Sequence, residues 1–234
     1  MIVLAVDSSG PVASTAVSQS GKILYESSAA VGLTHSQTLQ PMIENAMAAT
    51  GLSPRSLDLL ACVAGPGSFT GVRIGVCAVK AMAQALDKPC VALDALEVLA
   101  AGQFGFEGVI CPMLDARRGQ VYAAAFRFSQ GEAPQRLMED QALALDDYLA
   151  QLPKDERLLF VGDGVTALGG QVRAAAGERA LLCPDYRGQL RAGAACYLAP
   201  LKPATRAMEL SPIYLRKPQA QREREARLGG AGRG

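Results

Sequence analysis

The stretch AGPGSFTG at residues 64–71 decides how the first half of the chain folds. It holds three glycines, one proline and two hydroxyl residues, between an apolar run at 57–63 and an apolar helical pattern at 71–87. Glycine lets the backbone turn sharply or approach another group closely, and serine and threonine favour helix starts. The stretch therefore predicts a strand, a tight turn and a helix, whose free amides at its start would suit a phosphate.

This turn and the end of the first apolar run, MIVLAVDSS, supply one set of candidate site residues. No Gly-Lys-Ser/Thr follows the turn, and it lacks the G-x-G-x-x-G spacing, so it matches neither common nucleotide motif. Asp and Ser at a strand end are also ordinary turn formers. Phosphate binding and simple turn formation therefore both stay open, and Arg73 could instead pair with a carboxylate. The candidates are Asp7, Ser8, Gly65, Gly67, Ser68, Thr70, Gly71 and Arg73.

Strand and helix patterns alternate on both sides of the turn. Strand-like runs at 1–9 and 13–29 precede a helical pattern from Thr34 to Gly51, and a short strand and another helix follow the glycine turn. Strand-like runs begin again at 108–128, around a charged turn at 115–119. The order predicts an α/β protein with a first lobe at 1–102 and a second, smaller lobe at 103–218.

Composition and charge limit the classes of protein. Half of the 234 residues are hydrophobic, but no apolar run approaches the roughly 20 residues that span a bilayer. The six cysteines form no C-x-x-C pair and mostly lie in apolar surroundings, which favours buried thiols in a reducing, cytoplasmic compartment. The formal charge of +1 combines a body of about −3 with a basic end at 216–234. The composition of residues 219–234, which has almost no large apolar residues, predicts a disordered tail. Weak contact of this tail with RNA is a second interpretation.

The helical pattern from Thr34 carries a second set of candidates. An apolar stripe recurs at helical spacing, and it predicts either core packing or a docking face, part of which a kink at Pro41 would turn outward. The stripe consists of Leu39, Met42, Ile43, Ala46 and Met47. His35 is the only histidine, whereas metal sites usually need two or three ligands. We therefore expect no metal site and read His35 as a residue that hydrogen-bonds at the helix start. His35 and the stripe are also the candidate partner-binding residues, on a surface expected to lie on this helix and on the helix after the glycine turn.

Six motifs in order resemble the TsaB family, also written YeaZ, over residues 1–218. They are AVDSS, THSQTLQPMI, AGPGSFTGVRIGV, MLDARRGQVYAAAF, FVGDG and SPIYLRKP. The resemblance implies the actin-like ATPase fold, with two duplicated α/β lobes. It also implies a part in making threonylcarbamoyladenosine beside the anticodon of tRNAs that read ANN codons.

The resemblance further implies a non-catalytic scaffold, which docks on the related protein TsaD through its first lobe and is joined by the ATPase TsaE. It implies that the glycine loop is a vestigial or shared nucleotide loop, with no cofactor of its own and ATP or ADP at the partner interface. A homodimer is expected when the chain is alone, and tRNA is contacted through the complex. The alternative is an enzyme in its own right, either a peptidase of the glycoprotease superfamily or an ATPase.

Overall fold

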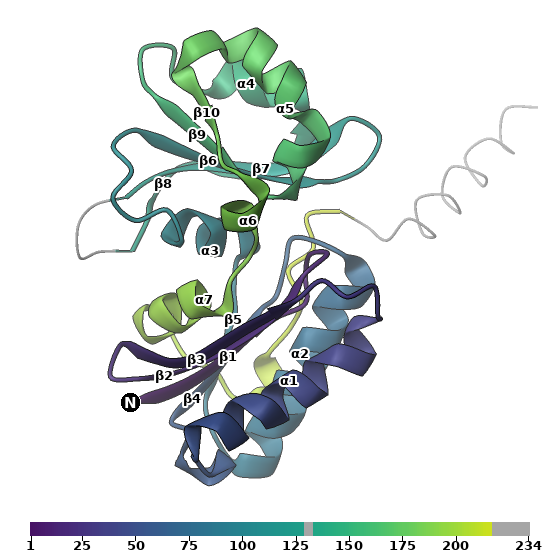
Figure 1. The fold of residues 1–234 in the computed structure, drawn as a ribbon, viewed down its shortest axis with the longest axis vertical. Helices are drawn as coiled ribbons and strands as arrows, with labels where there is room; N and C mark the ends of the chain where they lie inside the picture. The colour runs from purple at the N-terminus through teal and green to yellow at the C-terminus, as the bar shows by residue number, and fades with distance from the viewer. Residues whose placement is uncertain (129–132, 217–234) are drawn as a thin grey trace, which may run out of the picture.

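A computed structural model describes residues 1–128 and 133–216, which form two α/β lobes stacked end to end (Figure 1). Each lobe is built on a five-stranded mixed sheet. The predicted tail at 219–234 lies outside the described residues.

The first sheet has the strand order β3-β2-β1-β4-β5. Its antiparallel strands are β1 (Ile2–Asp7), β2 (Ala13–Gln19) and β3 (Lys22–Ala29). β4 (Leu59–Val63) pairs in parallel with β1, and β5 (Cys90–Leu93) pairs in parallel with β4. Helices α1 (His35–Thr50) and α2 (Phe69–Leu86) cover one face, and a short turn, η1 (Pro54–Ser56), follows α1. As predicted, α1 begins after Thr34 and ends at Gly51, whose φ of 66° suits glycine, and it continues through Pro41.

The second sheet repeats the first. The strand order across this sheet is β8-β7-β6-β9-β10. As in the first sheet, a three-stranded antiparallel meander is followed by two parallel strands. The strands are β6 (Val109–Asp115), β7 (Gln120–Arg127), β8 (Gln135–Ala144), β9 (Leu158–Val161) and β10 (Ala180–Leu182). Helices α4 (Leu145–Gln151) and α5 (Asp163–Ala176) and the turn η2 (Gly177–Arg179) complete the lobe. This duplicated topology confirms the expected actin-like fold.

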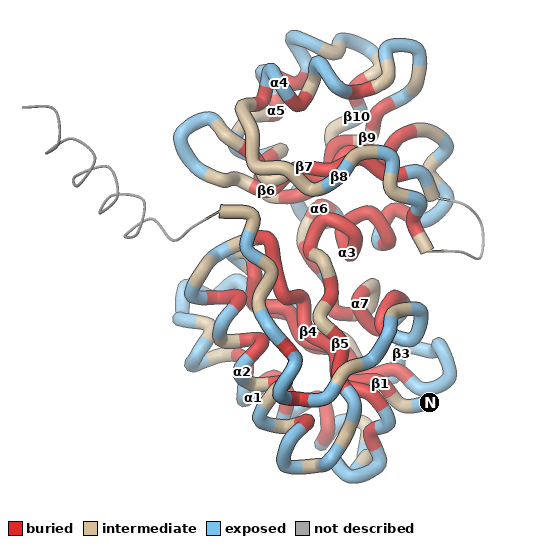
Figure 2. The backbone as a smooth tube through the Cα atoms, turned by 180° about the vertical axis from the view of Figure 1, so that it is seen from behind, coloured by how far each residue is buried: buried red, intermediate tan, exposed pale blue. Residues whose placement is uncertain are grey.

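Alternate residues of β1 point to opposite cores. Val3 and Ala5 join a cluster that passes through α3 (Ala95–Ala101) and α7 (Ala192–Leu198) to the second sheet, whereas Leu4 and Val6 pack beneath α1 and α2. This period of two explains why β1 is apolar throughout: it is buried on both faces. Figure 2 shows the buried strands at the centre of each lobe, with α3 and α7 between the two lobes.

The chain returns to the first lobe after β10. It passes through α6 (Asp185–Gly188), and then α7, η3 (Ala199–Leu201) and η4 (Ala207–Glu209) lie on the first lobe. Thr205 pairs with Cys90 at the edge of β5, and the Ile213 amide donates to the Ala64 carbonyl at 2.7 Å. The predicted assignment of all residues 103–218 to the second lobe therefore needs correction, because residues 192–214 complete the first one.

Candidate functional site

The glycine loop between β4 and α2 packs directly on the end of β1. The Ser68 amide donates to the Ser9 carbonyl at 2.7 Å, and the Ser8 hydroxyl donates to the Gly71 carbonyl at 2.8 Å. A Cβ atom at Gly67 would overlap the Ser9 carbonyl oxygen, and one at Gly71 would overlap that of Ser8. These glycines are therefore required for close approach of two backbone segments within the lobe.

Two predicted residues of the loop begin α2. Ser68 is its N-cap, since its hydroxyl oxygen accepts from the Gly71 amide at 3.3 Å, and Thr70 is exposed in the first turn. Gly65 has a φ of 113°, and a Cβ there would overlap the carbonyl oxygen of Ile213. The loop thus contacts the N-terminal strand on one side and the returning C-terminal segment on the other.

Asp7 lies fully buried beneath this loop. Its Oδ1 accepts from the Ser9 amide at 2.8 Å and from the Ser9 hydroxyl at 2.6 Å, whereas Oδ2 has no hydrogen-bond partner among the described residues. Burial raises the pKa of Asp7 to about 6, although the hydrogen bonds from Ser9 act in the opposite direction. Asp7 therefore holds the turn after β1 rather than standing at an open surface.

His35 makes the helix-start contact that the sequence predicted. Its Nε2 lies 2.8 Å from the carbonyl oxygen of Gly10, and its ring lies beside Gly71. The residue thus joins the start of α1 to the turn between β1 and β2. Within residues 1–128 and 133–216, no three His, Cys, Asp or Glu side chains come together in a way that could hold a metal ion.

A cleft of about 490 Å³ separates the two lobes at this point. Ser68 and Phe69 line it from the first lobe, and Asp115, Arg117 and Asp163 line it from the second. Asp163 begins α5, and its Oδ1 accepts from the Asp115 amide at 2.9 Å. Asp115 and Asp163 thus place two carboxyl groups on the far wall of the cleft, and burial raises the pKa of Asp163.

The last described residues close one end of the cleft. Tyr214 stacks on Phe69 with ring centroids 4.8 Å apart, and the Nε of Arg73 donates to the Tyr214 hydroxyl at 2.9 Å. The Arg73 guanidinium also lies 3.9 Å from the centre of the Phe69 ring. Arg73 therefore binds aromatic residues of its own chain, and the expected alternative of a carboxylate partner is wrong.

Comparison with known proteins decides the family. A TsaB protein of Bacillus subtilis, named as a tRNA threonylcarbamoyladenosine biosynthesis protein, is 32% identical over 94% of this chain and 96% of its own length. The chain belongs to the TsaB family. Two further proteins agree with this assignment. TsaB of Haemophilus influenzae is 29% identical, over 92% of this chain and 94% of that protein. The solved structure of YeaZ from Pseudomonas aeruginosa superposes with a TM-score of 0.78 at 27% identity, covering 92% of this chain and 99% of that one.

The chain is also similar to the transferase TsaD. Residues 29–183 match the family described as "TsaD: tRNA N6-adenosine threonylcarbamoyltransferase". A protein of that name from Erythrobacter litoralis is 43% identical over 63 residues, which is 27% of this chain and 18% of that protein. The close similarity to the transferase is therefore confined to a part of the TsaB fold.

The apolar stripe of α1 is buried in the core of the first lobe. Ala46 is fully buried and Met42, the most exposed of the five, is only 8% exposed. Leu39, Ile43 and Met47 pack in the core between α1, α2 and the sheet. The expectation that part of this stripe faces outward is wrong, because α1 stays in contact with β2 and β3 past Pro41.

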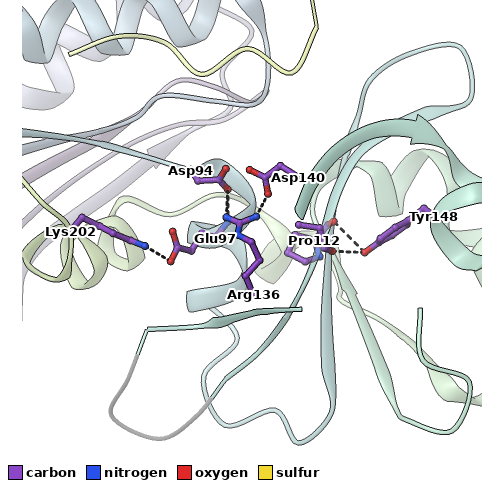
Figure 3. Close-up of polar contacts among 8 residues, drawn as sticks. Asp94, Glu97, Pro112, Arg136, Asp140, Tyr148 and Lys202 are labelled. Carbon is purple, nitrogen blue, oxygen red and sulfur yellow. Dashed lines mark hydrogen bonds and ion pairs between the residues drawn. The ribbon is translucent and has the colours of Figure 1, made fainter. Parts of the chain in front are cut away.

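Sequence reasoning missed a network of charges at the junction of the lobes (Figure 3). Asp94 caps α3, and Arg136 from β8 lies between Asp94, at 3.9 Å, and Asp140, with which it forms a close ion pair. Burial, and the neighbouring carboxyl of Asp140, raise the pKa of Asp94. Lys202 binds the buried Glu97 at 2.6 Å. Helix α3 is thus held by cations from two distant parts of the chain, which no local pattern could reveal.

Proposed function

We propose that this TsaB-family chain is a non-catalytic subunit that binds TsaD and supports formation of threonylcarbamoyladenosine in tRNAs that read ANN codons. The family membership supports the pathway, since the relatives are named for this biosynthesis. TsaE would join the assembly, and the chain would act in the cytoplasm. One feature of the fold, the outer face of α2, carries the partner role.

Helix α2 is apolar on nearly all sides but packs only one side inside the chain. Six of its 18 residues are buried. It is also long and apolar enough to cross a membrane by length and composition alone, yet its buried side is part of the first core. A helix that is apolar all round is normally covered on all sides, so its free side predicts a partner.

The free side of α2 suits another helix. Its exposed, uncharged residues from residue 77 onward are Cys77, Ala81, Gln84 and Ala85. They lie beside Ile74, Ala78 and Met82, which are half-buried against the first core. Arg73 and Lys80 are the only charged side chains of α2, and both are held by the chain's own C-terminal segment: Lys80 donates to the carbonyls of Met208 and Leu210. The remaining surface is uncharged and formed mostly by small side chains, which would allow another helix to pack closely. We place TsaD there in the complex, and a second copy there in a homodimer.

The glycine loop supports the non-catalytic part of the proposal. Gly67 packs against the Ser9 backbone and Gly71 against the Ser8 backbone, and Asp7 is buried beneath them. His35 is bound to a backbone carbonyl. The residues that first suggested nucleotide chemistry thus stabilise the lobe, and we propose that the chain has no cofactor of its own. Any ATP or ADP would be shared with its partners at the interface.

The test is association with the organism's TsaD, using Ala81→Glu on the free side of α2 and Ala174→Glu on the exposed side of α5 as the matched control. Burying an unpaired carboxylate costs several kcal/mol, so Ala81→Glu should weaken TsaD binding about a hundredfold or more. Both variants should keep the wild-type melting temperature. The control should bind normally.

Unchanged binding by a folded Ala81→Glu variant would place the interface elsewhere. A modification assay that omits each component in turn should show that TsaD alone is insufficient. Hydrolysis of ATP or of a peptide by the purified chain alone would instead favour an independent enzyme, and the proposal would fail.

A further inference from the structure

The turn between β6 and β7 has an unusual backbone. Arg117 and Arg118 are consecutive residues in the left-handed region, with φ values of 68° and 57°, and Gly119 follows at 72°. The Gln120 amide donates to the Arg117 carbonyl at 3.2 Å, so Arg118 and Gly119 are the central residues of a tight turn. A hairpin turn of this hand favours glycine, asparagine or aspartate at these positions.

Arginine is a costly choice for this backbone. A left-handed residue with a Cβ is less stable than glycine or asparagine there, and the cost is incurred twice in succession. Packing inside the lobe does not offset this conformational cost for either side chain, because the Arg117 side chain is 87% exposed and Arg118 is exposed too. Within the described ranges, no hydrogen bond or ion pair is found for the side chain of Arg118. Apart from an ion pair between Arg117 and Asp115, the fold does not account for two arginines here.

Other residues fix the turn in place. The Arg117 amide donates to Asp115 Oδ1 at 2.7 Å. From the C-terminal segment, Arg216 donates to the Ala116 carbonyl at 3.2 Å and to Gln120 Oε1 at 2.6 Å. The turn is thus held from both sides, and its two guanidinium groups are displayed from a rigid base.

The most exposed charged groups of this turn are positive. Arg117 and Arg216 line the cleft between the lobes. The Asp115 side chain, the ion-pair partner of Arg117 at 3.3 Å, is only 25% exposed, and Asp163 is half-buried. The acids therefore stand behind the exposed arginines. Because the chain before residue 216 carries a net negative charge, this positive group is local and not part of a generally basic surface.

We propose that Arg117 and Arg118 form a phosphate-binding tip that contacts the backbone of tRNA in the assembled complex. This inference rests on the proposed function, which brings tRNA to the complex. Exposed guanidinium groups on a fixed turn suit phosphate oxygens, which they bind in pairs of hydrogen bonds. The exposure of the tip favours a large ligand that lies across it over a nucleotide in the cleft, where Asp115 and Asp163 would repel a polyphosphate.

The test measures tRNA affinity of the complex with TsaD at several salt concentrations. The double variant Arg117→Asn/Arg118→Asn removes both charges and suits the left-handed backbone. The control, Arg55→Asn/Arg173→Asn, removes two exposed charges near the far ends of α1 and α5, whose first residues line the cleft. Melting temperature, TsaD association and ATP affinity are measured for the same proteins.

The tip variant should lose at least about tenfold in tRNA affinity, and its log–log salt slope should fall by about 2, one unit for each phosphate contact. Its melting temperature should not fall, and TsaD should bind normally. The control should stay within about twofold of wild type, as expected for charges outside the contact.

Normal assembly with TsaD and unchanged tRNA affinity in the tip variant would overturn this inference alone. A loss of ATP affinity with unchanged tRNA binding would assign the tip to a free nucleotide and would also overturn it. Failure of the wild-type chain to assemble with TsaD would overturn the proposed function, and this inference with it.

Discussion

Replacing Asp7 by asparagine should make the protein more stable at alkaline pH and should remove part of its pH dependence. The carboxyl is fully buried, and its Oδ2 has no hydrogen-bond partner among the described residues. Burial raises its pKa from 3.8 to about 6. A shift of about two pKa units corresponds to about 3 kcal/mol between the two protonation states. Ionised Asp7 therefore lowers the free energy of unfolding by about that much.

The sign follows from proton binding. Between pH 3.8 and about 6 the folded chain holds the Asp7 proton while the unfolded chain has released it, so the contribution of Asp7 to stability falls as pH rises through this window. About half of the effect lies between pH 5 and pH 8. The asparagine side chain of the variant cannot ionise. The stability difference between Asp7→Asn and wild type should therefore grow by about 1 to 2 kcal/mol over that interval.

Urea unfolding of both proteins at pH 5 and pH 8 measures this difference. Asp155→Asn, which changes an exposed carboxyl in the second lobe, is the control and should give the same difference from wild type at both pH values. Comparing each variant with wild type at the same pH cancels the titration of other groups, including Asp94 and Asp163. A difference for Asp7→Asn that does not change with pH would refute the argument, because Asp7 would then be ionised equally in both states.

Three further substitutions, two of them with a matched control, test the packing. Gly71→Ala should destabilise by about 3 kcal/mol or more in urea unfolding, because its Cβ would overlap the Ser8 carbonyl oxygen, whereas Gly170→Ala on exposed α5 should stabilise by up to about 1 kcal/mol. Ala46→Glu should leave the chain largely unfolded by circular dichroism, because Ala46 is fully buried. Ala48→Glu, on the exposed side of α1, should fold normally. Equal stability of the two variants would show that the stripe is exposed at the surface. Lys202→Met should lower the free energy of unfolding by about 1–3 kcal/mol by leaving Glu97 buried without its cation, and a loss below about 0.5 kcal/mol would show that the pair contributes little.

Local patterns in the sequence predicted the elements but not what covers them. Capping residues and apolar spacing placed α1 between Thr34 and Gly51, and the glycine turn placed α2. Five of the six cysteines are buried and all six are free, as their apolar surroundings predicted; Cys77 is exposed on α2. The stripe of α1 was equally compatible with core and interface, since periodicity reports which side is apolar and not whether the same chain covers it.

The predicted site failed where contacts are long-range. Asp7 and the glycine loop were correctly placed together at the sheet edge, but their glycines contact Ser8, Ser9 and Ile213 through backbone atoms, which carry no residue-type signal. Arg216 was counted only as part of a basic end, yet it fixes the turn at residues 115–120 across about 100 positions of sequence. The motif SPIYLRKP contains the residues that do this, and only the folded chain shows what they touch.

The return of residues 192–214 to the first lobe affects how the protein is made. The first sheet and its two helices are complete by residue 93, but α7 covers one face of that sheet and Ala207 and Leu210 belong to the core beneath α2. During synthesis, the N-terminal lobe would leave the ribosome with an apolar face uncovered until residues 192–214 have been translated. N-terminal domains commonly fold first as translation proceeds, whereas this one must wait for its own C-terminal segment. A product that ends before residue 192 would lack α7 and the C-terminal part of the first core, and its uncovered apolar face would favour aggregation.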